Sequence, residues 1–141
     1  MQVCPYLNFD GDCEEAMRFY AAALGGELPE IHRFSNMPSE QPMPPEVGNR
    51  VMHVTMNLPG GAVIMASDTF PGSDRVVGTN AAISIHPDSR DEADRIFAAL
   101  SEGAEVTMPL ADQFWGDYFG SLTDKYGVPW MINYNEAGVS G

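Results

Sequence analysis

The sequence has few basic residues. Seven lysines and arginines stand against 20 aspartates and glutamates, which gives a formal net charge of −13 over 141 residues. Such a surface repels phosphate backbones and anionic lipid headgroups, so neither nucleic acid nor a membrane is expected as a partner. No apolar run is long enough to cross a bilayer, and the first residues lack the basic and apolar parts of a signal peptide. We therefore expect a cytoplasmic protein.

Cysteine is also scarce. Because no secretion signal is present, the two cysteines, Cys4 and Cys13, are expected to be reduced thiols and not a disulfide framework. The sequence contains no CxxC or Cys/His zinc pattern, no P-loop, no HExxH and no nucleophile elbow. These absences exclude the enzyme and metal-site classes that such motifs define.

The same helix pattern occurs twice along the chain. Asp12 and Ser89 are each followed three residues later by glutamate, as in a capping box, and then by apolar residues at helical spacing as far as a glycine. Six residues recur 77 positions apart: Glu15, Ala16, Arg18, Ala21, Ala22 and Gly26 return as Glu92, Ala93, Arg95, Ala98, Ala99 and Gly103.

Each helix pattern stands between strand patterns, with a hairpin at the end of each half. The sequence therefore predicts an α+β fold with two βαβββ units in tandem. We place the units at about residues 1–70 and 78–135, within one domain of residues 1–141.

The predicted hairpins carry the clearest alternation. Residues 50–58 should form a strand with Val54 and Met56 on one face and His53 and Thr55 on the other, and residues 62–68 should return beside it. In the second half, strands are predicted near residues 118–122 and 128–134. Residues 35–49 hold four prolines and should be irregular, either as a lid or as a surface excursion.

The two ends of the chain carry a family resemblance. PYLNFDGDCEEAMRFYAAALGGE near the start and FWGDYFGSLTDKYGVPWMINY near the end, in a tandem βαβββ chain, resemble the PhnB-like branch of the vicinal oxygen chelate superfamily. That superfamily includes glyoxalase I, bleomycin-resistance proteins and extradiol dioxygenases. The resemblance covers nearly the whole chain. It implies a curved mixed sheet around a cleft, helices on the outside, and a homodimer.

The label that this branch often carries, 3-demethylubiquinone 3-methyltransferase-like, implies a methyl donor. A donor such as S-adenosylmethionine is usually held by a Gly-rich turn between a strand and a helix. Gly25 and Gly26 follow a predicted helix instead of preceding one, so they are a helix stop. The sequence gives the label no chemical support.

The resemblance also implies where the superfamily's enzymes hold a divalent metal, with four side chains, usually His and Glu, on strands of both units. At those positions the chain has Cys4 or Pro5, Met65, Ala81 or Ala82, and Met131. Metals that prefer imidazole and carboxylate bind thioether sulfur poorly. We expect no metal at these positions and no other cofactor.

The candidate site residues belong to the implied cleft. Five side chains are suited to an apolar ligand-binding wall: Met65, Trp115, Tyr118, Trp130 and Met131. Core packing would explain them equally well. His53 is the candidate general acid or base, with Asp68 or Tyr118 as its partner. A structural histidine is the alternative.

Three functions stay open at this point. The first is a metal-independent protein that binds a small, partly apolar molecule. The second is an enzyme of lyase, isomerase or hydrolytic type that uses His53, with a metal held elsewhere if one is present. The third is a protein whose function depends on its dimer and not on the cleft. The sequence does not decide whether any reaction is catalysed.

Overall fold

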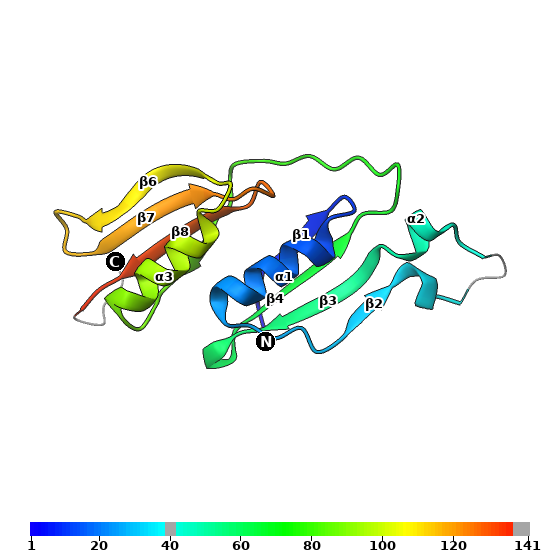
Figure 1. Ribbon diagram of the computed structural model, residues 1–141, viewed down its shortest axis with the longest axis horizontal. Coiled ribbons are helices and arrows are strands. Elements are labelled where there is room, and N and C mark those ends of the chain that lie inside the picture. The colour runs from blue at the N-terminus through cyan, green and yellow to red at the C-terminus, as the bar shows by residue number, and fades with distance from the viewer. Residues whose placement is uncertain (39–41, 137–141) are drawn as a thin grey trace. The chain divides into compact units, whose positions relative to one another are not determined.

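The computed structural model describes residues 1–38 and 42–136, in two compact units that meet in the chain at Val76 and Val77. Each unit has its own sheet and its own long helix (Figure 1). The two units are described separately below.

The first unit, Met1–Val76, has a four-stranded open sheet in the order β1-β4-β3-β2. Strand β1 is parallel to β4, and the other pairs are antiparallel. The strands are β1 (Tyr6–Phe9), β2 (Ile31–Arg33), β3 (Val51–Asn57) and β4 (Val63–Asp68). The helices are α1 (Cys13–Leu24), η1 (Phe34–Asn36), α2 (Pro45–Gly48) and η2 (Pro59–Gly61).

The second unit, Val77–Gly141, repeats this order as β5-β8-β7-β6, again with the first strand parallel to the last. The strands are β5 (Ile83–Ile85), β6 (Glu105–Asp112), β7 (Tyr118–Thr123) and β8 (Pro129–Tyr134), and the helix is α3 (Arg90–Leu100). The predicted fold class, two βαβββ units with mixed sheets, is thereby confirmed.

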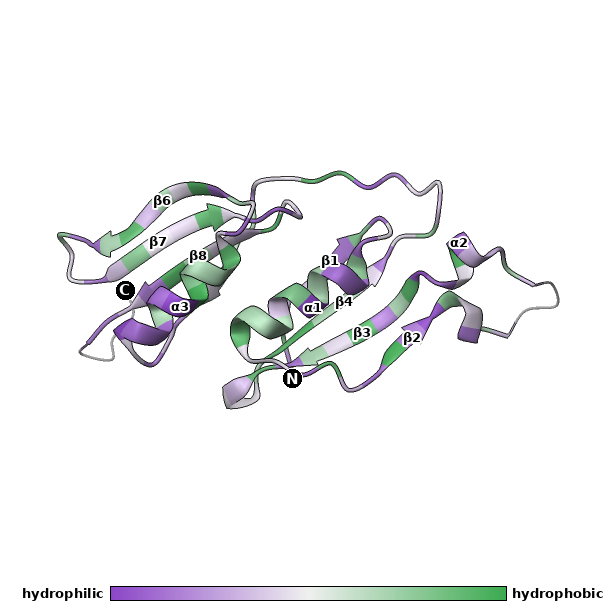
Figure 2. Cartoon of the chain, viewed as in Figure 1, coloured by the Kyte–Doolittle hydropathy of each residue, from purple (hydrophilic) through white to green (hydrophobic). Residues whose placement is uncertain are grey.

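Each helix covers one face of its own sheet, and the core lies between them. In the first unit, α1 buries Met17 and Tyr20 on the side where β3 and β4 bury Met56 and Ile64. In the second unit, α3 packs beside β8, and the fully buried side chains include Leu100, Trp130 and Ile132. Figure 2 shows the resulting alternation of hydrophobic and polar residues along helices and strands. Each large apolar side chain buried in this way contributes roughly 1.5–3 kcal/mol.

Gly120 shows how closely the layers of the second unit approach. A Cβ at this position would lie 2.8 Å from a ring carbon of Phe97 on α3 and 2.9 Å from the backbone of Leu110 on β6. Neither the helix nor the neighbouring strand leaves room for a side chain, so glycine is required where β7 passes beneath α3.

The structure confirms both predicted hairpins and both long helices, and it corrects two local predictions. Residues 35–49 are not wholly irregular, because this stretch contains the last two residues of η1 and the whole of α2. Residues 39–41 lie outside the described part of the chain. Ser89 caps α3 by accepting a hydrogen bond from the Glu92 amide at 3.0 Å, but Asp12 makes no side-chain cap bond to α1.

No helix within the described residues is long and apolar enough to cross a membrane.

Candidate functional site

The face of the first sheet that α1 leaves uncovered carries a row of side chains across three strands. Met65 on β4 is in register with Tyr6 on β1 and with Thr55 on β3. Successive residues of a strand point to opposite faces, so these side chains lie opposite the buried Val54 and Ile64. The row places an aromatic ring, a thioether and a hydroxyl side by side on one surface.

His53 joins this row through two hydrogen bonds. Its Nδ1 lies 3.3 Å from the hydroxyl of Tyr6, and its Nε2 lies 3.1 Å from Oγ1 of Thr55. The rings of Tyr6 and His53 have centroids 5.8 Å apart, and Tyr6 is 47% exposed. Because each hydroxyl can donate or accept, both neutral tautomers of His53 are satisfied. The predicted polar face of β3 is therefore present, and Tyr6 and Thr55 orient the imidazole on it.

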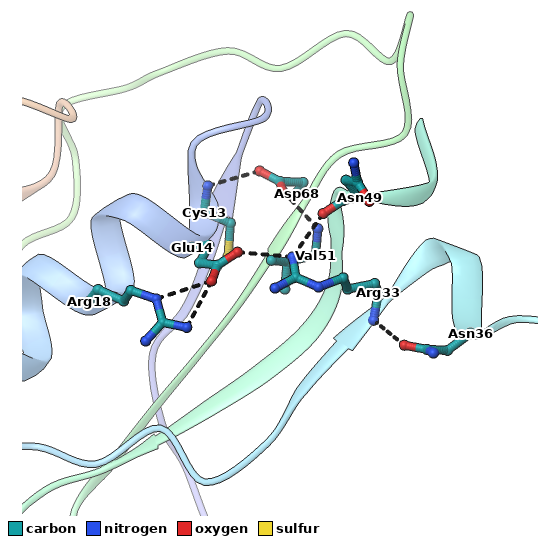
Figure 3. Close-up of polar contacts among 8 residues, drawn as sticks. All are labelled: Cys13, Glu14, Arg18, Arg33, Asn36, Asn49, Val51 and Asp68. Atoms are coloured by element: carbon teal, nitrogen blue, oxygen red, sulfur yellow. Dashed lines mark hydrogen bonds and ion pairs between the residues drawn. The ribbon is translucent and has the colours of Figure 1, made fainter. Parts of the chain in front are cut away.

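Asp68 lies on the other face of the sheet, under the start of α1. It is 4% exposed, and its carboxylate accepts hydrogen bonds from the backbone amides of Gly11 (2.8 Å), Cys13 (3.0 Å) and Val51 (2.9 Å). Figure 3 shows the carboxylate between the last two of these. The structure does not bring Asp68 to His53, which corrects the predicted catalytic pairing. Asp68 instead caps α1 and fixes the start of β3.

The same carboxylate affects the nearby thiol. Cys13 is fully buried beside Asp68, and burial first, with the charge of Asp68 next, raises the pKa of its thiol far above the ordinary value. A thiol that stays protonated is a poor nucleophile and a poor metal ligand. Cys13 is thereby excluded as a reactive group of this site.

A second polar cluster ties α1 to β2 (Figure 3). Glu14 accepts from Arg18 on the same helix at 2.8 Å and forms an ion pair with Arg33 on β2 at 2.9 Å. Arg33 also donates to the backbone carbonyl of Asn49 at 3.0 Å. These arginines, Arg33 first, lower the pKa of Glu14. The cluster holds the short edge strand β2 in place on the sheet.

In the second unit, Met131 lies on the face that α3 leaves uncovered. It is in register with Ser84 on β5 and with Ser121 on β7. Phe119, two residues before Ser121, shares this face and is paired with Asn133. Asn133 is 6% exposed, and its Oδ1 has no hydrogen-bond partner among the described residues.

Trp130 and Tyr118 point to the other side of that sheet, which corrects their predicted grouping with Met131. Trp130 is fully buried, and its indole Nε1 donates to Asp124 at 2.7 Å. The hydroxyl of Tyr118 donates to Asp94 on α3, and the Arg90 guanidinium lies 4.0 Å from the centre of the Tyr118 ring. Trp130 is therefore a core residue, and Tyr118 belongs to the helix side.

Tyr118 does line a polar hollow of about 290 Å³ beside the start of α3. The other residues that line this hollow are Arg90, Asp112, Gly116, Tyr134, Asn135 and Glu136. Arg90 already pairs with Asp112 there, so the strongest charges of the hollow satisfy each other.

Trp115 lies in the turn between β6 and β7 and is 49% exposed. Its ring lies against Phe114, with centroids 5.0 Å apart, and 6.2 Å from Phe119, while its indole Nε1 donates to Asp117. Through Phe119, Trp115 borders the uncovered face that holds Met131. Of the predicted ligand-binding residues, Met131 thus lies on the uncovered face of the second sheet with Trp115 at its border, and Met65 lies on the uncovered face of the first.

Sequence reasoning missed Tyr6, Thr55 and Phe119 as site residues. The signal was available for Thr55, which stands two residues from His53 on an alternating strand. Tyr6 lies opposite Met65 and Phe119 opposite Asn133, and only the register of the sheets shows this. Asn133 gave no such signal, since its burial depends on how the second sheet folds.

The residues do not fit the divalent metal that this fold implies. Thioethers stand at Met65 and Met131, and among the described residues Cys4, near the first strand, belongs to no group of three or more possible ligands. Across residues 1–38 and 42–136, no group of three or more His, Cys, Asp or Glu side chains is close enough to hold a metal ion. The donor set at these positions suits an apolar contact better than a hard or borderline cation.

The tandem βαβββ order and the mixed sheets define a class by its fold, that of the glyoxalase/bleomycin resistance/dioxygenase domains. A domain of this class from Frankia sp. EAN1pec covers 96% of the chain and 98% of its own, with a TM-score of 0.67 and 16% identity, a likeness of fold alone. Within that class, the model of the 3-demethylubiquinone-9 3-methyltransferase family matches residues 1–133, and the chain belongs to this PhnB-like family. The predicted resemblance is thereby confirmed.

Three relatives illustrate the family. Protein YjdN of Escherichia coli K12 is 32% identical over 144 residues, covering 94% of this chain and 95% of its own. The crystal structure of PA1353 from Pseudomonas aeruginosa has a TM-score of 0.84 at 38% identity, covering 96% of this chain and 98% of that one. A PhnB protein from Bacillus cereus has a TM-score of 0.76 at 27% identity, covering 95% and 99%.

Proposed function

We propose that this chain binds a small, partly apolar molecule on the uncovered face of its first sheet, without the superfamily's usual divalent metal site. The observation that carries the proposal is the row on the first sheet, in which a half-exposed Tyr6 ring lies beside Met65 and the hydrogen-bonded His53. An aromatic ring and a thioether supply apolar contact, and an imidazole with two hydroxyls supplies a few directed hydrogen bonds. This combination is typical of small-molecule sites.

The methyltransferase name of the family finds no support in the helix N-termini of the chain. At the start of α1, the amides of Gly11 and Cys13 already donate to Asp68. At the start of α3, the amide of Glu92 donates to Ser89. These amides are the groups that would otherwise face a nucleotide-like methyl donor. Both helix starts are closed by side chains of the protein itself.

Catalysis by His53 is not favoured. Asp68 is buried against three backbone amides, and Tyr118 donates to Asp94 within the second unit. His53 is left with the hydroxyls of Tyr6 and Thr55, which orient an imidazole but do not stabilise an imidazolium as a carboxylate would.

The test is a thermal-shift screen of small neutral aromatic compounds, followed by calorimetry of any that bind. A ligand at one hundred times its Kd should stabilise the protein by about 2.7 kcal/mol. Tyr6→Ala and His53→Ala should reduce this effect. Phe70→Ala should not, because Phe70 is an equally exposed aromatic residue of the first unit that lies against Phe34. Equal stabilisation of all three variants would contradict the proposal. Turnover of a bound compound that requires His53 would instead support the alternative, an enzyme that uses His53.

We also propose a homodimer, supported by the exposure of β6. This strand is the edge of the second sheet, and Val106 and Met108 on it are 41% and 40% exposed. Sedimentation velocity of the parent chain against Met108→Lys tests the proposal. We expect a dimer that the charged residue weakens, whereas a monomer at all concentrations would contradict it.

A further inference from the structure

The first sheet places two of the three histidines of the chain directly opposite each other. His32 on β2 pairs with His53 on β3 in the antiparallel register. Side chains at directly opposed positions point to the same face, with Cβ atoms roughly 4.5–5.5 Å apart. The two side chains therefore start from neighbouring positions on the uncovered face, although the ring of His53 is hydrogen-bonded to Tyr6 and Thr55 and not to His32.

We infer that His32 and His53 form a binding site for a divalent transition-metal ion, separate from the superfamily's metal positions. Imidazole is a preferred ligand of Cu²⁺, Ni²⁺ and Zn²⁺. Two imidazoles on adjacent strands are held by the register of the sheet, so the ordering of the backbone is complete before the ion arrives. Water completes the coordination, since the described residues hold no larger cluster of ligands.

The surroundings of the pair suit a cation. The side chain of His32 is 45% exposed, and Oε2 of Glu30 lies 3.6 Å from its Nε2, so one carboxylate stands beside the site. The nearest cation along the strand, Arg33, is paired with Glu14 and Asn49 instead. The net charge of −13 attracts cations to the whole surface.

His53 also has the outer hydrogen bonds that a metal-binding histidine needs. Such a histidine binds the ion with one ring nitrogen and donates the N–H of the other to an acceptor, which fixes the ring. The hydroxyl of Tyr6 lies at Nδ1 and that of Thr55 at Nε2. Both nitrogens are occupied in the structure, so the ion displaces one of these hydroxyls, and the other hydroxyl remains as the acceptor of the second nitrogen.

The experiment is calorimetric titration of the untagged, metal-free chain with Ni²⁺ and Zn²⁺. We expect one ion per chain. His32→Asn and His53→Asn should each weaken binding by more than about tenfold, the lower end of what loss of even an outer partner costs. The double variant should bind at least as weakly as the weaker single variant, because it also removes the imidazole that each single variant keeps.

His86→Asn is the matched control, since His86 is the remaining histidine and lies beside Ser84 in the second unit. It should bind the ion like the parent chain. Thermal unfolding without metal verifies that each variant is folded. Unchanged affinity in His32→Asn, loss of affinity in His86→Asn, or the absence of saturable binding would overturn the inference.

This inference goes beyond the proposed function and does not depend on it. His32→Asn keeps Tyr6, His53 and Met65, so it should lose the ion while it retains any organic ligand. Paramagnetic broadening by Ni²⁺ gives a second readout: the imidazole resonances of His32 and His53 should broaden together, and that of His86 should not.

Discussion

At the scale of single residues, Asp68 has the largest structural role among the predicted site residues. One buried carboxylate satisfies two amides at the start of α1 and one at the start of β3. Buried donors that lose their acceptor cost about 1–3 kcal/mol each, and bonds to a charged acceptor are the stronger ones. The start of α1, the start of β3 and the end of β4 are therefore all connected through one side chain.

Asp68→Ala should lower the free energy of unfolding by about 3 kcal/mol or more, because three buried amides lose their acceptor. Asp68→Asn should cost less, since one oxygen acceptor remains. Urea unfolding followed by circular dichroism measures both.

Asp12→Ala is the control for this prediction. Asp12 occupies the N-cap position of α1 but makes no cap bond, and its Oδ1 has no partner among the described residues. Its loss should change the free energy of unfolding by about 0.5 kcal/mol or less. A larger cost for Asp12→Ala than for Asp68→Ala would show that Asp12 is the true cap.

At the scale of elements, the β7–β8 hairpin is held by a carboxylate in its turn. Asp124 is 4% exposed and accepts from the amides of Tyr126 (2.8 Å) and Val128 (3.1 Å) and from the indole of Trp130 (2.7 Å). The first two bonds shape the turn, and the third connects it to the core under α3.

Asp124→Ala should lower the free energy of unfolding by about 2–4 kcal/mol, since a buried indole N–H and two turn amides lose their acceptor. Asp124→Asn, with nearly the same volume, should cost less because its carbonyl oxygen still accepts. Tryptophan fluorescence during guanidinium unfolding reports the change. Equal stability of Asp124→Ala and the parent chain would exclude this role of the turn.

The contact between α1 and β2 should depend on pH. Hydrogen bonds from Arg33 and then Arg18 lower the pKa of Glu14 below its ordinary value of 4.5. A lowered folded-state pKa means that the stabilisation is fully present above the unfolded-state pKa and is lost as the pH falls through the folded-state value.

Below about pH 4.5, the parent chain should therefore lose more stability than Glu14→Gln does, by roughly 0.5–1 kcal/mol for a partly exposed pair. Thermal unfolding between pH 7 and pH 3 measures the difference. Glu15→Gln, the adjacent glutamate, is the comparison for a general effect of charge. Parallel curves for the parent chain and Glu14→Gln would refute the assignment.

At the scale of the whole molecule, the chain is a duplicated βαβββ unit with an irregular, exposed connection. No strand or helix occurs between Asp68 and Ile83, and all residues from Phe70 to Ala82 are exposed. Arg75 lies in this connection, next to Val76, which is 90% exposed. The other arginines lie in or next to helices and strands, and Lys125 lies in the tight β7–β8 turn.

Limited digestion with trypsin should therefore cut first after Arg75, because proteases need an exposed and locally unfolded segment. The products should be two fragments that divide the chain near its middle, identified by mass spectrometry. Arg75→Gln should slow the first cleavage strongly. A first cut after Arg18 or Arg95 would instead show that a helix opens more readily than the connection.

The sequence determined the elements and their repetition. Periodicities of 3.6 and 2 are local properties, so the helices at 13–24 and 90–100 and the two hairpins could be predicted from their own residues. The recurrence of six residues from Glu15–Gly26 in Glu92–Gly103 predicted equal topologies, and the strand orders agree. The sequence also has methionine at 65 and 131, two positions where the family resemblance implies metal-binding residues.

Only the tertiary structure decided which side chains meet. Successive residues of a strand point to opposite faces of the sheet. Trp130 is therefore buried under α3, whereas Met131, next to it in sequence, lies on the uncovered face. The cap of α1 comes from Asp68 on a strand far along the chain, and no local pattern at Asp12 could reveal this. The His32–His53 pair exists because β2 and β3 take one particular register, which depends on packing between distant segments and not on either segment's own sequence.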